Sequence, residues 1–159
     1  MVCHSTNVLQ ASLTKLAGAF WDFTSNMEFK DSAYSSDALD VHTDTNYFTD
    51  SAGLQLFHLL SHDGTGGGSS LVDGFYAARS LHTTSARDYA QLARTKLFYH
   101  ASGNAGLSIQ GQTAFPVLVH DEHTRMLTQI RWNTADKAAF AVDLEAQPDE
   151  LDNWYIAAK

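Results

Sequence analysis

The chain has 159 residues, a length that suits one domain of ordinary size with a buried core. Hydrophobic residues make up 44% of it and charged residues 18%, which is typical of a globular protein and not of a disordered one. Ten basic residues against 18 acidic ones give a net charge of −8, and no basic run occurs, so nucleic acids and anionic membranes are disfavoured as partners.

The usual signals for export and membrane insertion are missing from the sequence. The one cysteine, Cys3, cannot form an internal disulfide, which favours a reducing compartment. No stretch approaches the roughly 20 apolar residues of a membrane helix, and the N-terminus shows neither a secretory core nor an Arg-rich presequence. We therefore expect an intracellular protein, cytoplasmic or mitochondrial, with no visible transit peptide and no membrane partner; homo-oligomer formation is left open.

The first elements in chain order are a helix and an irregular loop. Residues 8–21 predict a short amphipathic helix, because apolar side chains recur at intervals of three and four. These side chains are Leu9, Leu13, Leu16 and Phe20. Residues 22–40 are polar and rich in Ser and Asp, which is typical of a loop.

Two apolar segments follow, with glycines between them. Residues 54–60 predict a buried strand, in which His58 is a core histidine and not a metal ligand. A glycine run at residues 64–68 separates this strand from the apolar residues 70–74. We therefore expect the two segments to form an antiparallel pair.

The rest of the chain predicts helices first, then strands, then a final helix. Residues 75–81 and 86–98 are expected to be helical, and residues 115–120 and 126–132 to be strands joined by a charged turn. The last helix is expected over residues 148–158. Because strands and helices do not alternate regularly, the predicted fold class is mainly β with helices.

The residues that carry chemistry begin with His42-Thr43-Asp44. Side chains alternate along an extended segment, so a His and an Asp two residues apart point to the same side. Imidazole and carboxylate together suit Fe(II), and with a distant second His they form the facial triad of non-haem oxygenases. The triplet alone is a weak signal, because a surface His in a polar loop gives the same pattern.

Further motifs accompany the triplet in a consistent order and spacing. They are residues 21–25, 31–34, 38–48, 53–58, 66–75, 130–133 and 154–155. Together they resemble the trimethyllysine dioxygenases, which belong with the γ-butyrobetaine dioxygenases to the TauD-like family of Fe(II)/2-oxoglutarate oxygenases. The resemblance implies a double-stranded β-helix (jelly roll) with Fe(II), with 2-oxoglutarate as co-substrate, with ascorbate as reductant, and with trimethyllysine, hydroxylated for carnitine biosynthesis, as the small-molecule substrate.

The resemblance also implies which residues bind the metal and the co-substrate. His42 and Asp44 would be two of the three iron ligands. Ser69 stands where relatives place a Thr whose hydroxyl binds the distal carboxylate of 2-oxoglutarate. The alternative reading of Ser69 is a turn residue that satisfies local backbone groups.

Substrate-binding residues are implied in the same way. A trimethylammonium group cannot donate a hydrogen bond, so aromatic faces hold it best through cation–π attraction. Trp21 and Tyr34 match cage positions of the family. Asp31 stands where trimethyllysine enzymes have an acid that suits the α-ammonium group, which γ-butyrobetaine lacks. Asn133 matches a polar position that faces the substrate, and a structural Asn at a strand end is its alternative.

The sequence departs from the family in the segment that completes the site. The distal His ligand and the 2-oxoglutarate-binding Arg find no match after Asp152, so we expect an incomplete double-stranded β-helix over residues 21–159, after a divergent segment over residues 1–20. His100 as a substitute ligand and Arg131 as a substitute carboxylate clamp are weaker alternatives. We expect a fragment with little or no activity alone; a non-catalytic module that binds trimethylammonium groups and a γ-butyrobetaine dioxygenase are the alternative functions.

Overall fold

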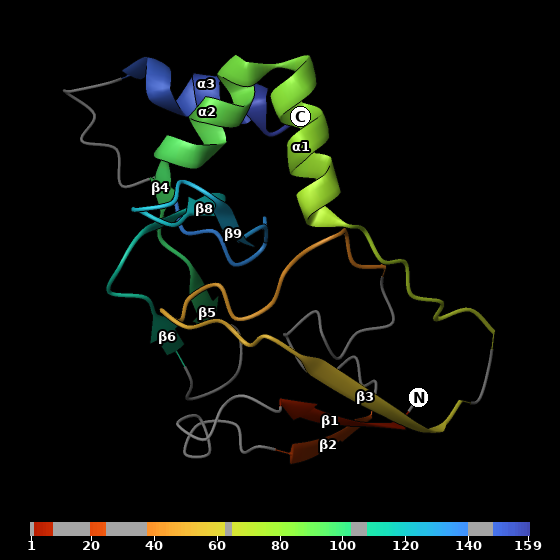
Figure 1. Cartoon of the computed structure of the whole chain (residues 1–159). Coiled ribbons are helices and arrows are strands. Elements are labelled where there is room, and N and C mark those ends of the chain that lie inside the picture. Colours follow the sequence, from red (N-terminus) through yellow and green to blue (C-terminus); the bar gives the residue numbers. More distant parts are fainter. Residues whose placement is uncertain (1, 8–19, 25–37, 63–64, 103–107, 140–147) are drawn as a thin grey trace. The chain divides into compact units, whose positions relative to one another are not determined.

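The computed structural model divides the chain into two compact units (Figure 1). The structure describes residues 2–7, 20–24, 38–62, 65–102, 108–139 and 148–159. Unit 1 comprises Met1–Asp40, Asp50–Ser69 and Ser102–Ser108, and unit 2 comprises Val41–Thr49, Ser70–Ala101 and Ile109–Lys159. Each unit is considered by itself below.

Unit 1 contains a three-stranded antiparallel sheet in the order β2-β1-β3. Its strands are β1 (Val2–Asn7), β2 (Phe20–Thr24) and β3 (Gln55–Ser61). The predicted strand at residues 54–60 is confirmed as β3. The predicted helix over residues 8–21 is wrong for Phe20 and Trp21, because both pair with β1 through backbone hydrogen bonds. Residues 8–19 lie outside the described residues.

The predicted pairing of residues 54–60 with residues 70–74 is wrong. β3 pairs with β1 instead. Asp73 caps the N-terminus of α1 (Gly74–Thr84), and its side chain accepts a hydrogen bond from the backbone N–H of Tyr76 at 2.9 Å. A carboxylate at this position satisfies an N–H that has no partner within the helix, and so it favours a helix start over a strand.

Unit 2 contains all three described helices, α1, α2 (Ala86–Arg94) and α3 (Pro148–Ala157). The helices predicted at residues 75–81, 86–98 and 148–158 are confirmed, with the bounds given above. Ser85 ends α1 through its backbone N–H and caps α2 through its side chain. α2 ends at Arg94, earlier than predicted, because the next residues enter a strand.

The other strands form short pairs. β4 (Lys96–Leu97) pairs antiparallel with β7 (Phe115–Pro116), and β8 (Leu118–His120) with β9 (Leu127–Ile130), all four in unit 2. β5 (His100–Ser102) pairs with β6 (Ser108–Gln110), whose end residues Ser102 and Ser108 are assigned to unit 1. The predicted strands at residues 115–120 and 126–132 are confirmed for residues 115–116, 118–120 and 127–130, and the turn between them is confirmed. The described chain is therefore a mixture of helices and small antiparallel sheets.

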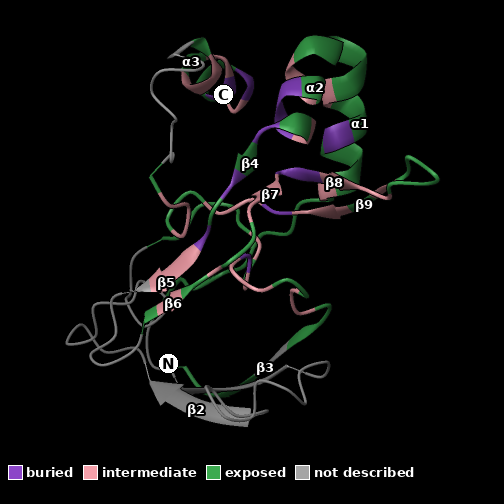
Figure 2. Cartoon of the chain, turned by 90° about the vertical axis from the view of Figure 1, so that its left-hand side faces the viewer, coloured by how far each residue is buried: buried purple, intermediate pink, exposed green. Residues whose placement is uncertain are grey.

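The hydrophobic core belongs to unit 2. All residues described as buried lie in this unit, on its helices and strands, in the short segments next to them, and in the loop Val41–Thr49 (Figure 2). The buried apolar residues are Ala78, Leu92, Leu97, Tyr99, Val117, Leu118, Trp154 and Ala157. β3 was predicted to be buried, and this is wrong for His58, Leu59 and Leu60, which are exposed. Among the described helices, none has the length and apolar character that a membrane span requires.

Candidate metal site

His42 and Asp44 lie in the loop Val41–Thr49 of unit 2, which contains neither helix nor strand. The imidazole Nε2 of His42 is 3.4 Å from the carboxylate Oδ1 of Asp44, and the two side chains are 32% and 44% exposed. They lie side by side, as the alternation of an extended segment predicts. Their role as metal ligands stays a prediction.

The residue between the two candidate ligands is anchored to the end of β9. The backbone N–H of Thr43 donates to the carbonyl of Trp132 at 2.6 Å, and the Trp132 N–H donates to the Thr43 hydroxyl at 2.8 Å. Thr43 is less exposed than its two neighbours. The loop therefore fixes Thr43 while His42 and Asp44 face outward.

Asn46 closes the loop on the other side of Asp44. Its side chain is 1% exposed. Its amide donates to the Thr43 carbonyl at 2.8 Å, and its side-chain oxygen accepts from the Thr43 hydroxyl at 3.0 Å. Between Asp44 and Asn46, Thr45 has φ +58°. This is a left-handed conformation that a β-branched residue rarely adopts.

Arg131 follows β9 and is buried against the same loop. It is 1% exposed, and its guanidinium donates to the main-chain carbonyls of Asn46, Phe48 and Thr49. Its own carbonyl accepts from the hydroxyl of Tyr99. The alternative in which Arg131 binds a co-substrate carboxylate does not hold, because its guanidinium is enclosed by protein acceptors.

The pKa of the Tyr99 hydroxyl is raised by its burial beside Arg131. Tyr99 is 2% exposed, and burial raises the pKa of its hydroxyl well above the ordinary value, while the nearby charge of Arg131 offsets part of that rise. Below this raised pKa the hydroxyl is neutral and donates to the Arg131 carbonyl.

Asn133 reaches the candidate loop through Thr43. Its amide nitrogen is 3.5 Å from the Thr43 carbonyl and donates to Asp136 at 3.0 Å. Its side-chain oxygen accepts the backbone N–H groups of Ala135 and Asp136, each at 3.0 Å. These contacts are those of a structural Asn at a strand end, and contact with substrate stays a prediction.

The other predicted binding residues belong to unit 1. Ser69 is exposed and follows Gly66 and Gly67, whose φ values of +90° and +71° require glycine. Trp21 lies in β2 opposite Ser5 of β1. Asp31 and Tyr34 lie outside the described residues.

A third metal ligand does not appear beside His42 and Asp44 within the described ranges. No three His, Cys, Asp or Glu side chains gather there as a metal site requires. His100, the predicted substitute, lies in β5, where its backbone N–H donates to the Asp136 carbonyl. The donors that are present, one imidazole nitrogen and one carboxylate oxygen on neighbouring exposed side chains, fit two positions of an Fe(II) facial triad.

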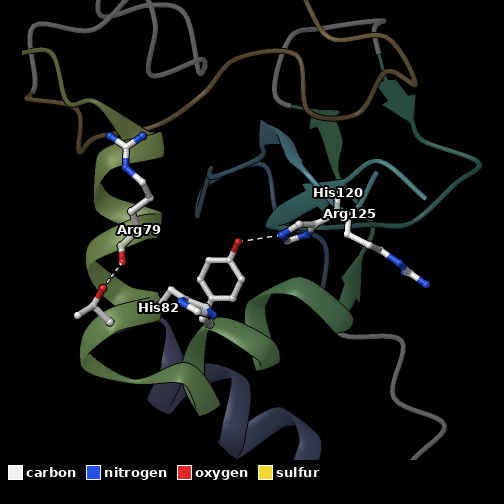
Figure 3. A pocket seen from close by; sticks show the side chains of 6 residues that line it. Arg79, His82, His120 and Arg125 are labelled. Carbon is white, nitrogen blue, oxygen red and sulfur yellow. Dashed lines mark hydrogen bonds between the residues drawn. The ribbon is translucent and has the colours of Figure 1, made fainter. Parts of the chain in front are cut away.

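A separate pocket of unit 2 contains none of the predicted site residues (Figure 3). Its lining residues are Arg79, His82, Thr83, Tyr89, His120 and Arg125. The Tyr89 hydroxyl and His120 Nε2 are 2.8 Å apart, and His120 Nδ1 is 3.1 Å from the Leu118 carbonyl. The guanidinium groups of Arg79 and Arg125 point away from one another, so they do not converge on one ligand.

The sequence did not identify the residues that support the loop. Asn46 and Arg131 stand inside motifs that pointed to a family, but Asn46 was assigned no role and Arg131 only the alternative role of a carboxylate clamp. A buried polar residue near a candidate ligand is the only signal that could have found them, and burial of a polar side chain is not visible in one sequence.

Comparison with known proteins identifies the class to which this chain belongs. Residues 11–154 match the family described as taurine catabolism dioxygenase TauD, TfdA family. The match covers most of the chain, and the chain belongs to this family.

Individual relatives narrow the comparison within this family. The chain is 38% identical to a trimethyllysine dioxygenase of Neurospora crassa, over 89% of this chain and 36% of the relative. It is 37% identical to the mitochondrial trimethyllysine dioxygenase of Mus musculus, over 88% of this chain and 33% of the relative. Identity to a γ-butyrobetaine dioxygenase of a Pseudomonas strain is 30%, over 88% of this chain and 34% of the relative. The chain thus spans about a third of the length of the curated relatives it matches.

Proposed function

We propose that this chain contributes two iron ligands, His42 and Asp44, to an Fe(II)- and 2-oxoglutarate-dependent trimethyllysine dioxygenase. The observation that carries the proposal is the side-by-side arrangement of these two side chains on an anchored loop. Identities of 37% and 38% to trimethyllysine dioxygenases, against 30% to a γ-butyrobetaine dioxygenase, support the choice of substrate.

In this proposal His42 and Asp44 hold the metal on the exposed side of the loop, and Thr43 holds them in place. When bound, iron and 2-oxoglutarate supply the activation of O2 and the electrons for hydroxylation, 2-oxoglutarate being oxidised to succinate and CO2, with ascorbate as reductant. Two protein ligands bind a divalent metal less tightly than three. We therefore expect this chain alone to bind iron weakly and to turn over little.

The same proposal assigns the co-substrate and the finer fold. Ser69 would bind the distal carboxylate of 2-oxoglutarate through its hydroxyl, and the glycines before it let the backbone approach closely. Residues 21–159 would form part of a double-stranded β-helix, after a divergent segment at residues 1–20. By the name of its mouse relative, the compartment would be the mitochondrion.

For the substrate, the proposal places Trp21 and Tyr34 around the trimethylammonium group, where aromatic faces attract a cation that cannot donate hydrogen bonds. Asp31 would pair with the α-ammonium group of trimethyllysine. Asn133 would provide a polar contact. γ-Butyrobetaine lacks the α-ammonium group, so Asp31 favours trimethyllysine over it.

The metal assignment is tested by titrating Co2+, as a stand-in for Fe(II), into the metal-free chain while the imidazole signals are followed by NMR. We expect the His42 signals to shift first and this preference to be lost in Asp44→Ala, while in His42→Ala no imidazole should respond at the low Co2+ concentrations at which His42 responds in the unaltered chain. His123→Ala is the matched control, because His123 is an exposed His in the β8–β9 turn. Equal responses of His42 and His123 in the unaltered chain would contradict the assignment.

The substrate assignment is tested by following the N-methyl signal of trimethyllysine on addition of the chain, with γ-butyrobetaine and lysine as controls. Line broadening for trimethyllysine, reduced in Asp31→Asn, is the expected result. Broadening that is equal with and without metal, together with no 2-oxoglutarate decarboxylation, would favour the non-catalytic binding module. Stronger broadening for γ-butyrobetaine would favour that dioxygenase.

A further inference from the structure

We propose that Arg131 is the positioning residue that holds the loop of His42 and Asp44 in the conformation that presents both side chains together. The inference rests on the proposed function, since the two side chains are the proposed iron ligands. Arg131 is not expected to bind metal, substrate or co-substrate. Its contacts to the loop and to the core carry the argument.

The guanidinium holds the segment that directly follows Asp44. It donates to the carbonyl of Asn46 at 2.8 Å, to that of Phe48 at 2.7 Å and to that of Thr49 at 2.6 Å. Three carbonyls within four consecutive residues can accept from one group only if the backbone curls around it. The guanidinium therefore sets the curvature of the loop just beyond Asp44.

The charge of Arg131 is buried, so its donors need hydrogen-bond acceptors within the protein. The side chain is 1% exposed. Its Nε donates to the side chain of Gln129 at 3.1 Å, and its guanidinium carbon lies 3.9 Å from the ring centre of Phe115. A buried cation is costly unless its donors are satisfied. Release of the loop would leave the cation without three acceptors, so the loop and the guanidinium hold one another.

The backbone of Arg131 is fixed in the core, so its side chain is a rigid support for the loop. Its N–H donates to the carbonyl of Val117 at 2.9 Å, and its carbonyl accepts from the Tyr99 hydroxyl at 3.0 Å. The next residue, Trp132, donates its backbone N–H to the Thr43 hydroxyl, and its carbonyl accepts from the backbone N–H of Thr43. Residues 131–132 therefore hold the loop on both sides of Asp44.

Thr45 shows why such a support is needed. Its φ of +58° places a β-branched residue in the left-handed region. Such conformations persist only where the surrounding structure enforces them, and they gather at functional sites. Thr45 lies directly between Asp44 and the first carbonyl that Arg131 holds, that of Asn46.

Lysine cannot replace arginine in this role. A guanidinium is planar and carries five donors in a fixed fork, whereas an ammonium group has three donors at one point. Arg131→Lys therefore keeps the charge but cannot reach the carbonyls of Asn46, Phe48 and Thr49 and the side chain of Gln129 together.

The test uses amide hydrogen exchange of the metal-free chain and Co2+ titration at His42. In Arg131→Lys we expect exchange at Thr43 and Phe48 to accelerate about 10-fold or more relative to amides of α2. We expect Co2+ affinity at His42 to fall about 10-fold to 100-fold, as when the supports of metal ligands are removed. Tyr89→Phe is the matched control, because it removes a side-chain hydrogen bond of unit 2, that to His120, which involves neither Arg131 nor the loop; it should leave both ratios within about 2-fold.

The outcomes separate the inference from the proposed function. Loop exchange that stays unchanged in Arg131→Lys, or that rises no more than exchange in α2, would overturn the inference. Faster loop exchange in a chain that never binds Co2+ at His42 would support the positioning role and contradict the iron assignment.

A measurement on the unaltered chain covers the case in which Arg131→Lys does not fold. The guanidinium N–H protons of Arg131 should exchange far more slowly than those of Arg79, which is exposed. Equally fast exchange of the two guanidinium groups would overturn the inference.

Discussion

Leu97 of β4 and Leu59 of β3 are the same residue type in antiparallel strands, yet they are 3% and 50% exposed. Leu97 belongs to unit 2, where it joins the core together with side chains of α2 and α3. Leu59 belongs to unit 1, where the described residues of β3 face solvent. Among the described residues, these two leucines therefore differ in packing although they are the same residue type.

The candidate site residues are also divided between the two units. His42, Asp44 and Asn133 belong to unit 2, whereas Trp21 and Ser69 belong to unit 1. A packed core holds neighbouring groups in one arrangement. Within the proposed site, the pair His42–Asp44 therefore lies on a loop that hydrogen bonds tie to buried Arg131 and to Trp132.

The largest expected effect tests the comparison directly with matched substitutions. Leu97→Ala should lower the free energy of unfolding by about 2–5 kcal/mol, because it opens a cavity in the core. Leu59→Ala should change it by no more than about 0.5 kcal/mol, as for other exposed positions. Urea denaturation of both variants measures the difference. Equal losses would mean that β3 is as well packed as β4 and would break the comparison.

The next largest expected effect is the change in stability when each of two glycines is replaced by alanine. A Cβ on Gly111 would lie 2.9 Å from the Tyr47 carbonyl oxygen and 3.4 Å from that of Tyr99, whereas a Cβ on Gly68 would meet nothing within 4 Å. Gly111→Ala should cost about 1–3 kcal/mol, because backbone atoms must shift. Gly68→Ala should be neutral or stabilise by up to about 1 kcal/mol by restricting the unfolded chain. Thermal unfolding distinguishes the two, and a neutral Gly111→Ala would mean that the close approach is absent.

Tyr99 predicts a loss of stability in alkaline solution. Its pKa is raised by burial, so its contribution is present below the ordinary tyrosine pKa of about 10 and is lost as the pH rises above it. The slope is at most about 1.4 kcal/mol per pH unit for one proton. The unfolding midpoint of the unaltered chain should fall between pH 9 and 11 more than that of Tyr99→Phe.

Tyr76→Phe is the control for this experiment, because Tyr76 is 64% exposed. It should follow the unaltered chain at every pH. If Tyr99→Phe did so as well, the buried hydroxyl would not be the source of the alkaline loss.

The smallest effect comes from the turn between β8 and β9. The backbone N–H and hydroxyl of Thr124 lower the pKa of the exposed Asp121 carboxylate. A lowered pKa gives stability that is present above the ordinary value and is lost as the pH falls through the folded one. Asp121→Asn should therefore lower the melting temperature slightly at pH 7, and the difference from the unaltered chain should vanish near pH 2. A difference that persists in acid would contradict this account.

Elements that depend on local signals were predictable from the sequence. The helix α2 followed from periodicity, α3 was expected over residues 148–158, and the β8–β9 turn followed from its run of charged residues between apolar ones. Residues 70–74 were mispredicted because their apolar character suggested a strand, whereas the Asp73 cap starts a helix. For β3 the strand was predicted correctly, but its partner β1 and its exposure were not.

The candidate site shows the same division. The side-by-side placement of His42 and Asp44 follows from alternation over three residues, and the motifs around them led to the family. The support from Arg131 could not be predicted, because its acceptors lie 82 to 85 positions earlier in the chain. Nothing in the sequence around Arg131 indicates that its side chain is buried.

By itself, then, the sequence determined the acidic globular character of this protein, most of its helices, its family and the two candidate ligands, since composition, periodicity and motif spacing are local properties of a chain. Only the tertiary structure decided which apolar strand is buried, that Asn133 and Arg131 approach the loop of His42 and Asp44, and that Thr45 is held in a left-handed conformation. The physical reason is that burial and long-range hydrogen bonds depend on which distant segments meet, and one sequence does not state this.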